Sequence, residues 1–141
     1  MANGVIPTAM RQYVCTRAHG LCEYCFSPAM YSPGAFSVDH IIPSSLGGET
    51  VPDNLAYCCN GCNGHKFNKT HFVDPLTNQI TRLYHPRQLQ WGDHFKWSED
   101  DLLILGITPI GRATVELLQV NRLSNINLRG LLKTAGLHPP K

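Results

Sequence analysis

Two pairs of cysteines, each in a Cys-x-x-Cys arrangement, constrain the fold of this chain more than any other feature. Cys22 and Cys25 form the first pair, and Cys59 and Cys62 form the second. Each pair places two thiolates on one tight turn, at a separation that suits two corners of a tetrahedral metal site. The segment between the pairs is longer than the roughly 15–20 residues that separate the pairs of a zinc ribbon. We therefore expect a four-cysteine metal site with a structured insertion inside it.

Zn²⁺ is the expected metal, because four thiolates form a closed tetrahedral site that leaves no position for water or substrate. Such a site is structural by its coordination, and it would stabilise a small core. A redox-active Cys-x-x-Cys and buried free thiols are the alternatives, but two pairs together favour zinc over both. Cys15 and Cys58 remain, and we expect both to be small buried side chains rather than ligands.

Composition places few limits on function. The 141 residues are enough for one domain, with or without a tail, and the hydrophobic fraction of 43% is ordinary for a globular chain. A formal net charge of +2 permits nucleic-acid binding without demonstrating it. The sequence has no apolar run of the roughly 20 residues needed to cross a membrane, and it does not start like a secretion signal. We therefore expect a cytoplasmic protein without membrane contact.

Local signals in the first half predict a helix, two strands and a second helix. Proline at the start and glycine after the end favour a helix over residues 7–19. β-branched and aromatic residues predict a strand over 35–42 and a short second strand over 54–58. The glycines and prolines of 43–52 indicate a loop between these strands. A helix is expected over 59–68, so the insertion between the cysteine pairs ends at a helix.

The second half predicts a hairpin followed by two helices. Residues 79–84 have the composition of a strand, and the aromatic-rich segment 91–97 is expected to pair with it. Thr108 suits the N-cap of a helix because a proline follows it. Ser124 or Asn125 is expected to cap a final helix near the end of the chain.

Asp39 and His40, which are adjacent and lie between the cysteine pairs, add chemistry that a structural metal site does not need. A carboxylate is a hard oxygen ligand that suits Mg²⁺ or Mn²⁺. A histidine that is neutral near pH 7 is suited to act as a general base on water. Asn63 directly follows Cys62, so the zinc site would fix the position of an amide oxygen. That oxygen can complete the shell of a metal ion without adding charge.

These motifs resemble the HNH endonucleases, the ββα-metal or His-Me finger superfamily, in the stand-alone type found in bacteria or phage. The resemblance covers about Leu21 to Lys69, where Asp-His-Ile-x-Pro, Gly-Gly, Asn-Leu, Cys-x-x-Cys-Asn and Lys follow in the order of the family. Residues 74–121 are similar to the tail of bacterial stand-alone members. The resemblance implies an α+β fold: a ββα-metal core with the zinc site and an N-terminal helix over 1–72, and a strand and helix extension packed on it over 73–141.

The resemblance also implies a role for each motif residue. His40 would be the general base that activates water against a DNA phosphodiester, and Asp39 would bind one divalent Mg²⁺ or Mn²⁺ ion. Asn54 would hold the loop between the strands and so position His40. Asn63 would be the second metal ligand, in a position that is often histidine in the family. His65 is the alternative, but two residues along a helix rotate the side-chain direction by about 200°, so both cannot face one metal ion.

The expected partner is DNA, and no small-molecule cofactor is expected. Lys66 and Lys69 are the expected phosphate contacts of the core. Eight further basic residues in the second half fit a DNA track along one face, but they fit a solvated surface equally well. They are Arg82, His85, Arg87, Lys96, Arg112, Arg122, Arg129 and Lys133.

Three aromatic residues, Trp91, Phe95 and Trp97, could stack on bases, but aromatic residues at this density belong more often to a core. We expect a monomer with one active site, which would nick one strand at a time. The alternative function is a catalytically inactive zinc-containing module that kept the fold and binds DNA or protein.

Overall fold

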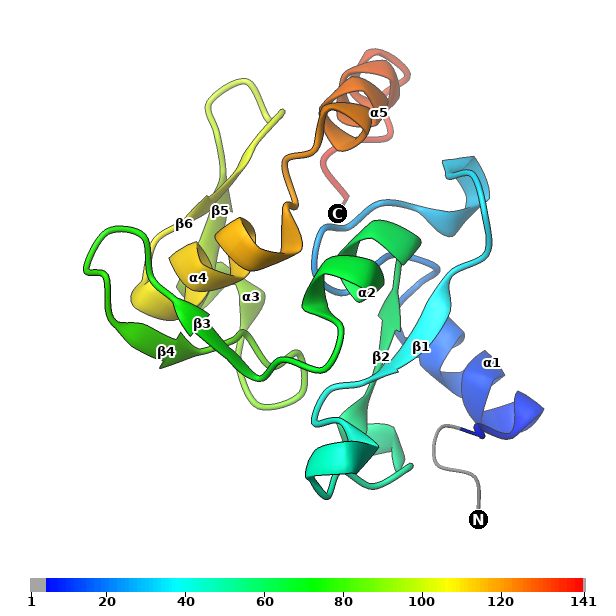
Figure 1. Ribbon diagram of the computed structural model, residues 1–141. Coiled ribbons are helices and arrows are strands. Elements are labelled where there is room, and N and C mark those ends of the chain that lie inside the picture. Colours follow the sequence, from blue (N-terminus) through cyan, green and yellow to red (C-terminus); the bar gives the residue numbers. More distant parts are fainter. Residues whose placement is uncertain (1–4, 141) are drawn as a thin grey trace.

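The computed structural model describes residues 5–140, in which three two-stranded antiparallel sheets are joined by five α-helices and short 3₁₀ turns (Figure 1). One sheet and one helix form a ββα unit in the first half, with a helix before it and further strands and helices after it. This arrangement confirms the mixed α and β class that the sequence predicts. No helix within residues 5–140 is both long and apolar enough to cross a membrane.

Helix α1, Thr8–Arg17, packs on the ββα unit through a small apolar cluster. Pro7 directly precedes the helix, where its fixed φ suits a helix start. Gly20 follows the helix with a φ of 70°, a left-handed conformation that glycine adopts without steric cost. Val14, fully buried, lies in one cluster with Leu55 and so attaches the helix to the strands.

The ββα unit consists of β1, Ser37–His40, its antiparallel partner β2, Leu55–Cys58, and helix α2, Asn60–Lys66. Asp39 is paired with Ala56 across the two strands. Helix α2 contacts β1 on one side and helix α4, Pro109–Leu118, of the second half on the other (Figure 1). Three 3₁₀ turns flank the strands: Ala29–Tyr31, Ser44–Leu46 and Pro52–Asn54.

The second half contains two short hairpins and three helices. Its elements are β3 (His71–Val73), β4 (Ile80–Arg82), α3 (Trp91–His94), β5 (Phe95–Trp97), β6 (Ile104–Gly106), α4 (Pro109–Leu118) and α5 (Leu123–Thr134). Strand β3 pairs with β4, and β5 pairs with β6. The expected pairing of 79–84 with 91–97 is therefore wrong, and residues 91–94 form helix α3 instead.

A tight turn explains why β4 pairs with β3. The Asp74 carboxylate accepts hydrogen bonds from the Leu76 backbone N–H at 3.1 Å and from the Thr77 hydroxyl at 2.8 Å. Asn78 completes the turn with a φ of 60°, which asparagine tolerates better than most residues. An aspartate that bonds its own following backbone favours such a turn, so the nearest segment in the sequence becomes the partner strand.

The helix caps of the second half agree with expectation in one case and differ in the other. The Thr108 hydroxyl accepts a hydrogen bond from the Gly111 N–H at 3.1 Å, so Thr108 caps α4 as the sequence predicts. Helix α5 begins at Leu123, before both residues that were expected to cap it, and shows no side-chain cap. Asn125 is buried in the first turn and donates to the backbone oxygen of Val120 instead.

One apolar cluster joins the two halves of the chain. It contains the metal-site cysteines together with buried side chains of the second half, such as Tyr84, Phe95 and Leu118. Trp91 stacks on Phe95 with 5.2 Å between ring centroids, which agrees with a core role for these aromatic residues. The expected boundary between residues 72 and 73 falls inside strand β3.

An ion pair fixes the first hairpin of the second half to helix α4. The Arg112 guanidinium donates from Nε and Nη2 to the two carboxylate oxygens of Asp74, each at 2.9 Å. This bidentate contact holds the pKa of Asp74 well below its usual range. Arg112 is thus used for folding rather than left free for DNA.

We predict that two glycine-to-alanine substitutions in neighbouring helices have opposite effects on stability. A Cβ atom on Gly111 in α4 would overlap the carbonyl oxygen of His94, so Gly111→Ala is expected to destabilise the fold by about 1–3 kcal/mol. Gly130 in α5 has only an ordinary contact with Leu102 at 3.9 Å, so Gly130→Ala is expected to stabilise by up to about 1 kcal/mol. Urea unfolding at a fixed zinc concentration measures both, and equal midpoints would contradict the close approach of α3 and α4.

Candidate metal centre and candidate active site

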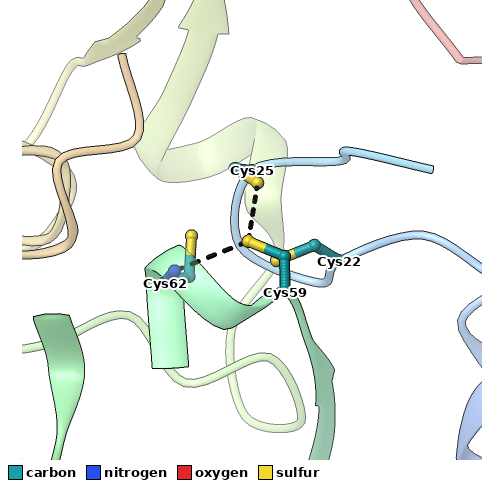
Figure 2. A group of neighbouring side chains, drawn as sticks. All are labelled: Cys22, Cys25, Cys59 and Cys62. Atoms are coloured by element: carbon teal, nitrogen blue, oxygen red, sulfur yellow. Dashed lines mark hydrogen bonds between the residues drawn. The ribbon is translucent and has the colours of Figure 1, made fainter. Parts of the chain in front are cut away.

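The four cysteines of the two Cys-x-x-Cys pairs meet at one buried point (Figure 2). All four sulfur atoms lie within 4.8 Å of one another, and Sγ of Cys25 lies 3.6 Å from Sγ of Cys59. A tetrahedral zinc site with Zn–S bonds of about 2.3 Å has sulfur atoms about 3.8 Å apart. The cluster is therefore compatible with a structural metal ion such as zinc, as the spacing of the cysteines predicts.

Two local turns place these sulfur atoms. In the first pair, the Cys22 carbonyl accepts a hydrogen bond from the Phe26 N–H, and Phe26 has a φ of 62°. In the second pair, Sγ of Cys59 caps the start of α2 by accepting a hydrogen bond from the Cys62 N–H at 3.5 Å. The second pair therefore fixes where helix α2 begins. Cys58 is buried but is not part of the four-cysteine cluster.

Arg122 contacts the cluster from the loop between α4 and α5. Its guanidinium donates to Sγ of Cys59 at 3.5 Å and to Sγ of Cys62 at 3.9 Å. The same side chain donates to the backbone oxygens of Leu118 and Gln119, both at 3.0 Å. Four thiolates with one Zn²⁺ carry a net charge of −2, so a fixed guanidinium beside them offsets part of a buried negative charge.

Asp39, His40 and Asn63 line one open cleft of about 370 Å³ on the ββα unit. Strand β1 supplies the first two residues, and helix α2 supplies Asn63, which directly follows Cys62. His65, the alternative to Asn63, is exposed, and its Nδ1 lies 2.7 Å from the backbone oxygen of Gly61. Among the described residues, Asn63 and not His65 borders the cleft of Asp39.

The Asp39 carboxylate is held through one of its two oxygens. Oδ2 accepts a hydrogen bond from the Tyr24 hydroxyl at 3.3 Å and pairs with the Lys66 ammonium at 3.0 Å. No residue within 5–140 donates a hydrogen bond to Oδ1. Burial raises the pKa of Asp39, while Lys66 and Tyr24 oppose this shift. The contacts orient the carboxylate and leave one oxygen free to bind a cation.

Lys66 does not have the exposed position that was expected of a phosphate contact. The side chain is 1% exposed, and its Nζ donates to the backbone oxygen of Ile41 at 3.1 Å in addition to its pairing with Asp39. The reason is its position on α2, on the side that faces the end of β1. Lys69 lies beyond the helix and is exposed, as a phosphate contact requires.

His40 and the loop after it are joined by a set of hydrogen bonds. Nε2 of His40 shares a hydrogen bond of 2.8 Å with the Thr50 hydroxyl. The Asn54 amide oxygen accepts from the Ile42 N–H at 2.9 Å. The Asn54 amide nitrogen donates to the backbone oxygens of Ile42 at 3.0 Å and Glu49 at 2.9 Å. Asn54 thus ties together the two ends of the loop that carries the partner of His40.

The sequence did not predict three residues that contact the site: Thr50 bonds to His40, Tyr24 bonds to Asp39, and Arg122 bonds to the cysteines. Thr50 had a usable signal, because it lies between the glycine pair and Asn54 in the loop that follows His40. Tyr24 lies inside the first Cys-x-x-Cys turn, so a position near the site could have been inferred. Arg122 had no local signal, because it is far from the cysteines in the sequence and only the packing of the second half brings it close.

Several basic residues expected on a DNA track serve internal contacts instead. Arg112 pairs with Asp74, Arg87 pairs with Glu23, and Arg122 contacts the cysteines. Arg129 is buried, and its guanidinium donates to the backbone oxygens of Leu102 and Val120. Arg82, His85 and Lys96 form no ion pair within residues 5–140, and they do not lie on one element; Arg82 and His85 line a common cleft, whereas Lys96 lies outside it.

Residues 22–80 match the sequence model of a family described as HNH endonuclease. The match begins at the first metal-site cysteine, includes β1, β2, α2 and β3, and ends at the start of β4. No curated protein matches the chain. The matched segment contains the four-cysteine cluster and the cleft of Asp39, His40 and Asn63. Over residues 22–80, the match confirms the resemblance to the HNH endonucleases that the sequence motifs indicate.

Proposed function

We propose that the protein is a metal-dependent endonuclease that hydrolyses DNA phosphodiester bonds. The observation that carries this proposal is the cleft on the ββα unit, which brings a carboxylate, an imidazole and an amide together. These are the side chains of Asp39, His40 and Asn63. Members of the matched family act on nucleic acid as nucleases, so the comparison supports the same substrate class for this cleft.

Asp39 and Asn63 would hold a divalent cation, because a free carboxylate oxygen and an amide oxygen are the donors that Mg²⁺ and Mn²⁺ prefer. When bound, the cation would polarise the scissile phosphate and stabilise the leaving oxygen. Lys66 already balances much of the charge of Asp39. The two donors alone therefore attract a cation weakly, and oxygens of the substrate phosphate would complete the shell.

His40 would act as the general base through Nδ1. If the Nε2–H donates to the Thr50 hydroxyl at 2.8 Å, the lone pair of the neutral ring lies on Nδ1. That nitrogen takes a proton from a water molecule as the water attacks phosphorus. Asn54 holds the loop of Thr50 and so fixes the ring plane. One such site cuts one strand in each encounter, which favours nicking.

The ion pair between Lys66 and Asp39 favours a second candidate function. An ammonium 3.0 Å from the carboxylate competes with a divalent cation for the same residue. A protein in which Lys66 always wins would keep the fold and bind DNA or another protein without cutting. Cleavage assays with several divalent metals separate the two functions.

We predict that purified protein nicks supercoiled plasmid in the presence of Mg²⁺ or Mn²⁺, and that His40→Ala reduces the rate by about 10²–10⁴-fold. The loss of the base explains the effect. His65→Ala is the matched control, because His65 is exposed outside the cleft, and it is expected to cut like the wild type. Equal background cleavage by the wild type and His40→Ala would contradict the proposal, and DNA retardation without cleavage under any metal would support the inactive module.

We predict that a mild chelator stops cleavage before it unfolds the protein. Oxygen ligands bind Mg²⁺ weakly, whereas four thiolates bind zinc tightly and stabilise the fold. The measurements are plasmid nicking, circular dichroism and metal content at each chelator concentration, with one zinc per chain expected at the start. If activity, secondary structure and zinc disappear together, two metals with separate functions are ruled out.

We predict that Thr50 positions the His40 ring. Thr50→Val keeps the shape but removes the hydroxyl, and kcat is expected to fall on the order of tenfold while KM stays unchanged. Thr50→Ser retains the hydroxyl and is expected to restore most of kcat. A Val variant as active as the Ser variant would show that the hydrogen bond has no part in catalysis.

A further inference from the structure

A second cleft, of about 290 Å³, opens between the segment after β1 and the β3–β4 hairpin. Ile41 and Ile42, which directly follow His40, form one side of it. Its lining residues include no aspartate or glutamate. Five of them are basic or histidine: Lys66, Lys69, His71, Arg82 and His85. A cleft with this composition has a positive potential that favours an anion.

His85 adds a hydrogen-bond donor of fixed orientation to this cleft. Its Nδ1 accepts hydrogen bonds from the backbone N–H groups of Arg87 at 3.2 Å and Gln88 at 3.3 Å. The ring proton therefore lies on Nε2. The side chain is only 5% exposed, and no residue within 5–140 accepts a hydrogen bond from Nε2. Nε2 is not fully enclosed by protein, so an acceptor oxygen of a ligand in the cleft would receive its hydrogen bond.

The charges around His85 point to the same kind of ligand. Burial lowers the pKa of His85, and the neighbouring Arg82 lowers it further, so the ring is a neutral donor near pH 7. Arg82 is held at the edge of the cleft, because its Nη2 donates to the side chain of Gln88 at 2.8 Å. Lys69, which is exposed past the end of α2, also lines the cleft. Two cations and a neutral donor match an anionic group with several acceptor oxygens.

We propose that this cleft binds a backbone phosphate of the DNA substrate next to the site of cleavage, with Lys69, Arg82 and His85 as donors. The proposal rests on DNA being the substrate. Both clefts border the continuous segment 39–44: Asp39 and His40 line the first, and Ile41 and Ile42 line the second. A strand that lies along this segment would therefore present one phosphate to each cleft.

The test measures binding of a fluorescein-labelled DNA duplex by anisotropy over a range of KCl concentrations. The parent protein and every variant carry His40→Ala, so that the DNA is not cleaved during the measurement. Lys69→Gln and Arg82→Gln are each expected to weaken binding about tenfold at low salt, and to reduce the slope of log K against log salt by about 0.9. Lys96→Gln removes an exposed cation outside the cleft and is the matched control, with no change in affinity or slope expected.

Two substitutions of His85 separate binding from folding. Asn places an amide at the position of Nδ1, so His85→Asn keeps the acceptor for the turn and loses the donor. Gln reaches the position of Nε2, so His85→Gln keeps a donor in the cleft. His85→Asn is expected to weaken DNA binding about tenfold without changing the salt slope, because a neutral hydrogen bond to a phosphate is lost. His85→Gln is expected to bind like the parent.

The outcomes for this cleft and for catalysis are distinguishable. If the Lys69, Arg82 and His85→Asn variants all bind like the parent, or if the parent binds no DNA, the phosphate site is refuted, whatever the plasmid assay shows. If these variants weaken binding but the wild type never cuts, the phosphate site stands and the nuclease function fails. Equal competition by inorganic phosphate at micromolar concentration would assign the cleft to a free anion and refute a DNA contact.

Discussion

The convergence of four cysteine thiols is the constraint on which the rest of the structure depends. It joins the turn after α1 to the first turn of α2, and it therefore determines where α2 lies against β1. On that helix, Lys66 pairs with Asp39, and Asn63 lines the same cleft as Asp39. A structural metal ion bound by the four cysteines would thus control the geometry of residues that line the cleft. The charge of the cluster in turn requires a cation, which Arg122 supplies from the second half.

Buried or half-buried ion pairs explain why so few basic residues remain for DNA. Lys66, Arg112 and Arg122 each neutralise an acidic or thiolate group inside the structure. Such pairs add little stability by themselves, but removing one partner leaves an uncompensated charge, which is strongly destabilising. Through Arg112 and Arg122, the second half therefore supplies positive charges that balance negative groups inside the structure. Two basic residues that remain exposed, Lys69 and Arg82, line the cleft beside the segment that follows His40.

The sequence predicted the features that depend on local spacing. The cysteine pairs, the two strands, the helix that follows them and the Thr108 cap all follow from patterns within a few residues. Properties that depend on three-dimensional neighbours were missed. A lysine next to the motif was assigned to phosphate, but burial against β1 pairs it with Asp39. The aromatic content of residues 91–97 predicts the wrong partner for the strand at residues 80–82, because the turn made by Asp74 brings residues 71–73 beside it instead.

Lys66 connects the two clefts. Its ammonium pairs with Asp39 in the first cleft, and its side chain also lines the second. An anion in the second cleft would attract the ammonium and weaken its hold on the carboxylate, which would strengthen cation binding there. Linkage requires the reverse effect to be equal in free energy, so a cation at Asp39 would strengthen anion binding by the same factor. A single buried lysine would thus make the occupancy of the two clefts cooperative.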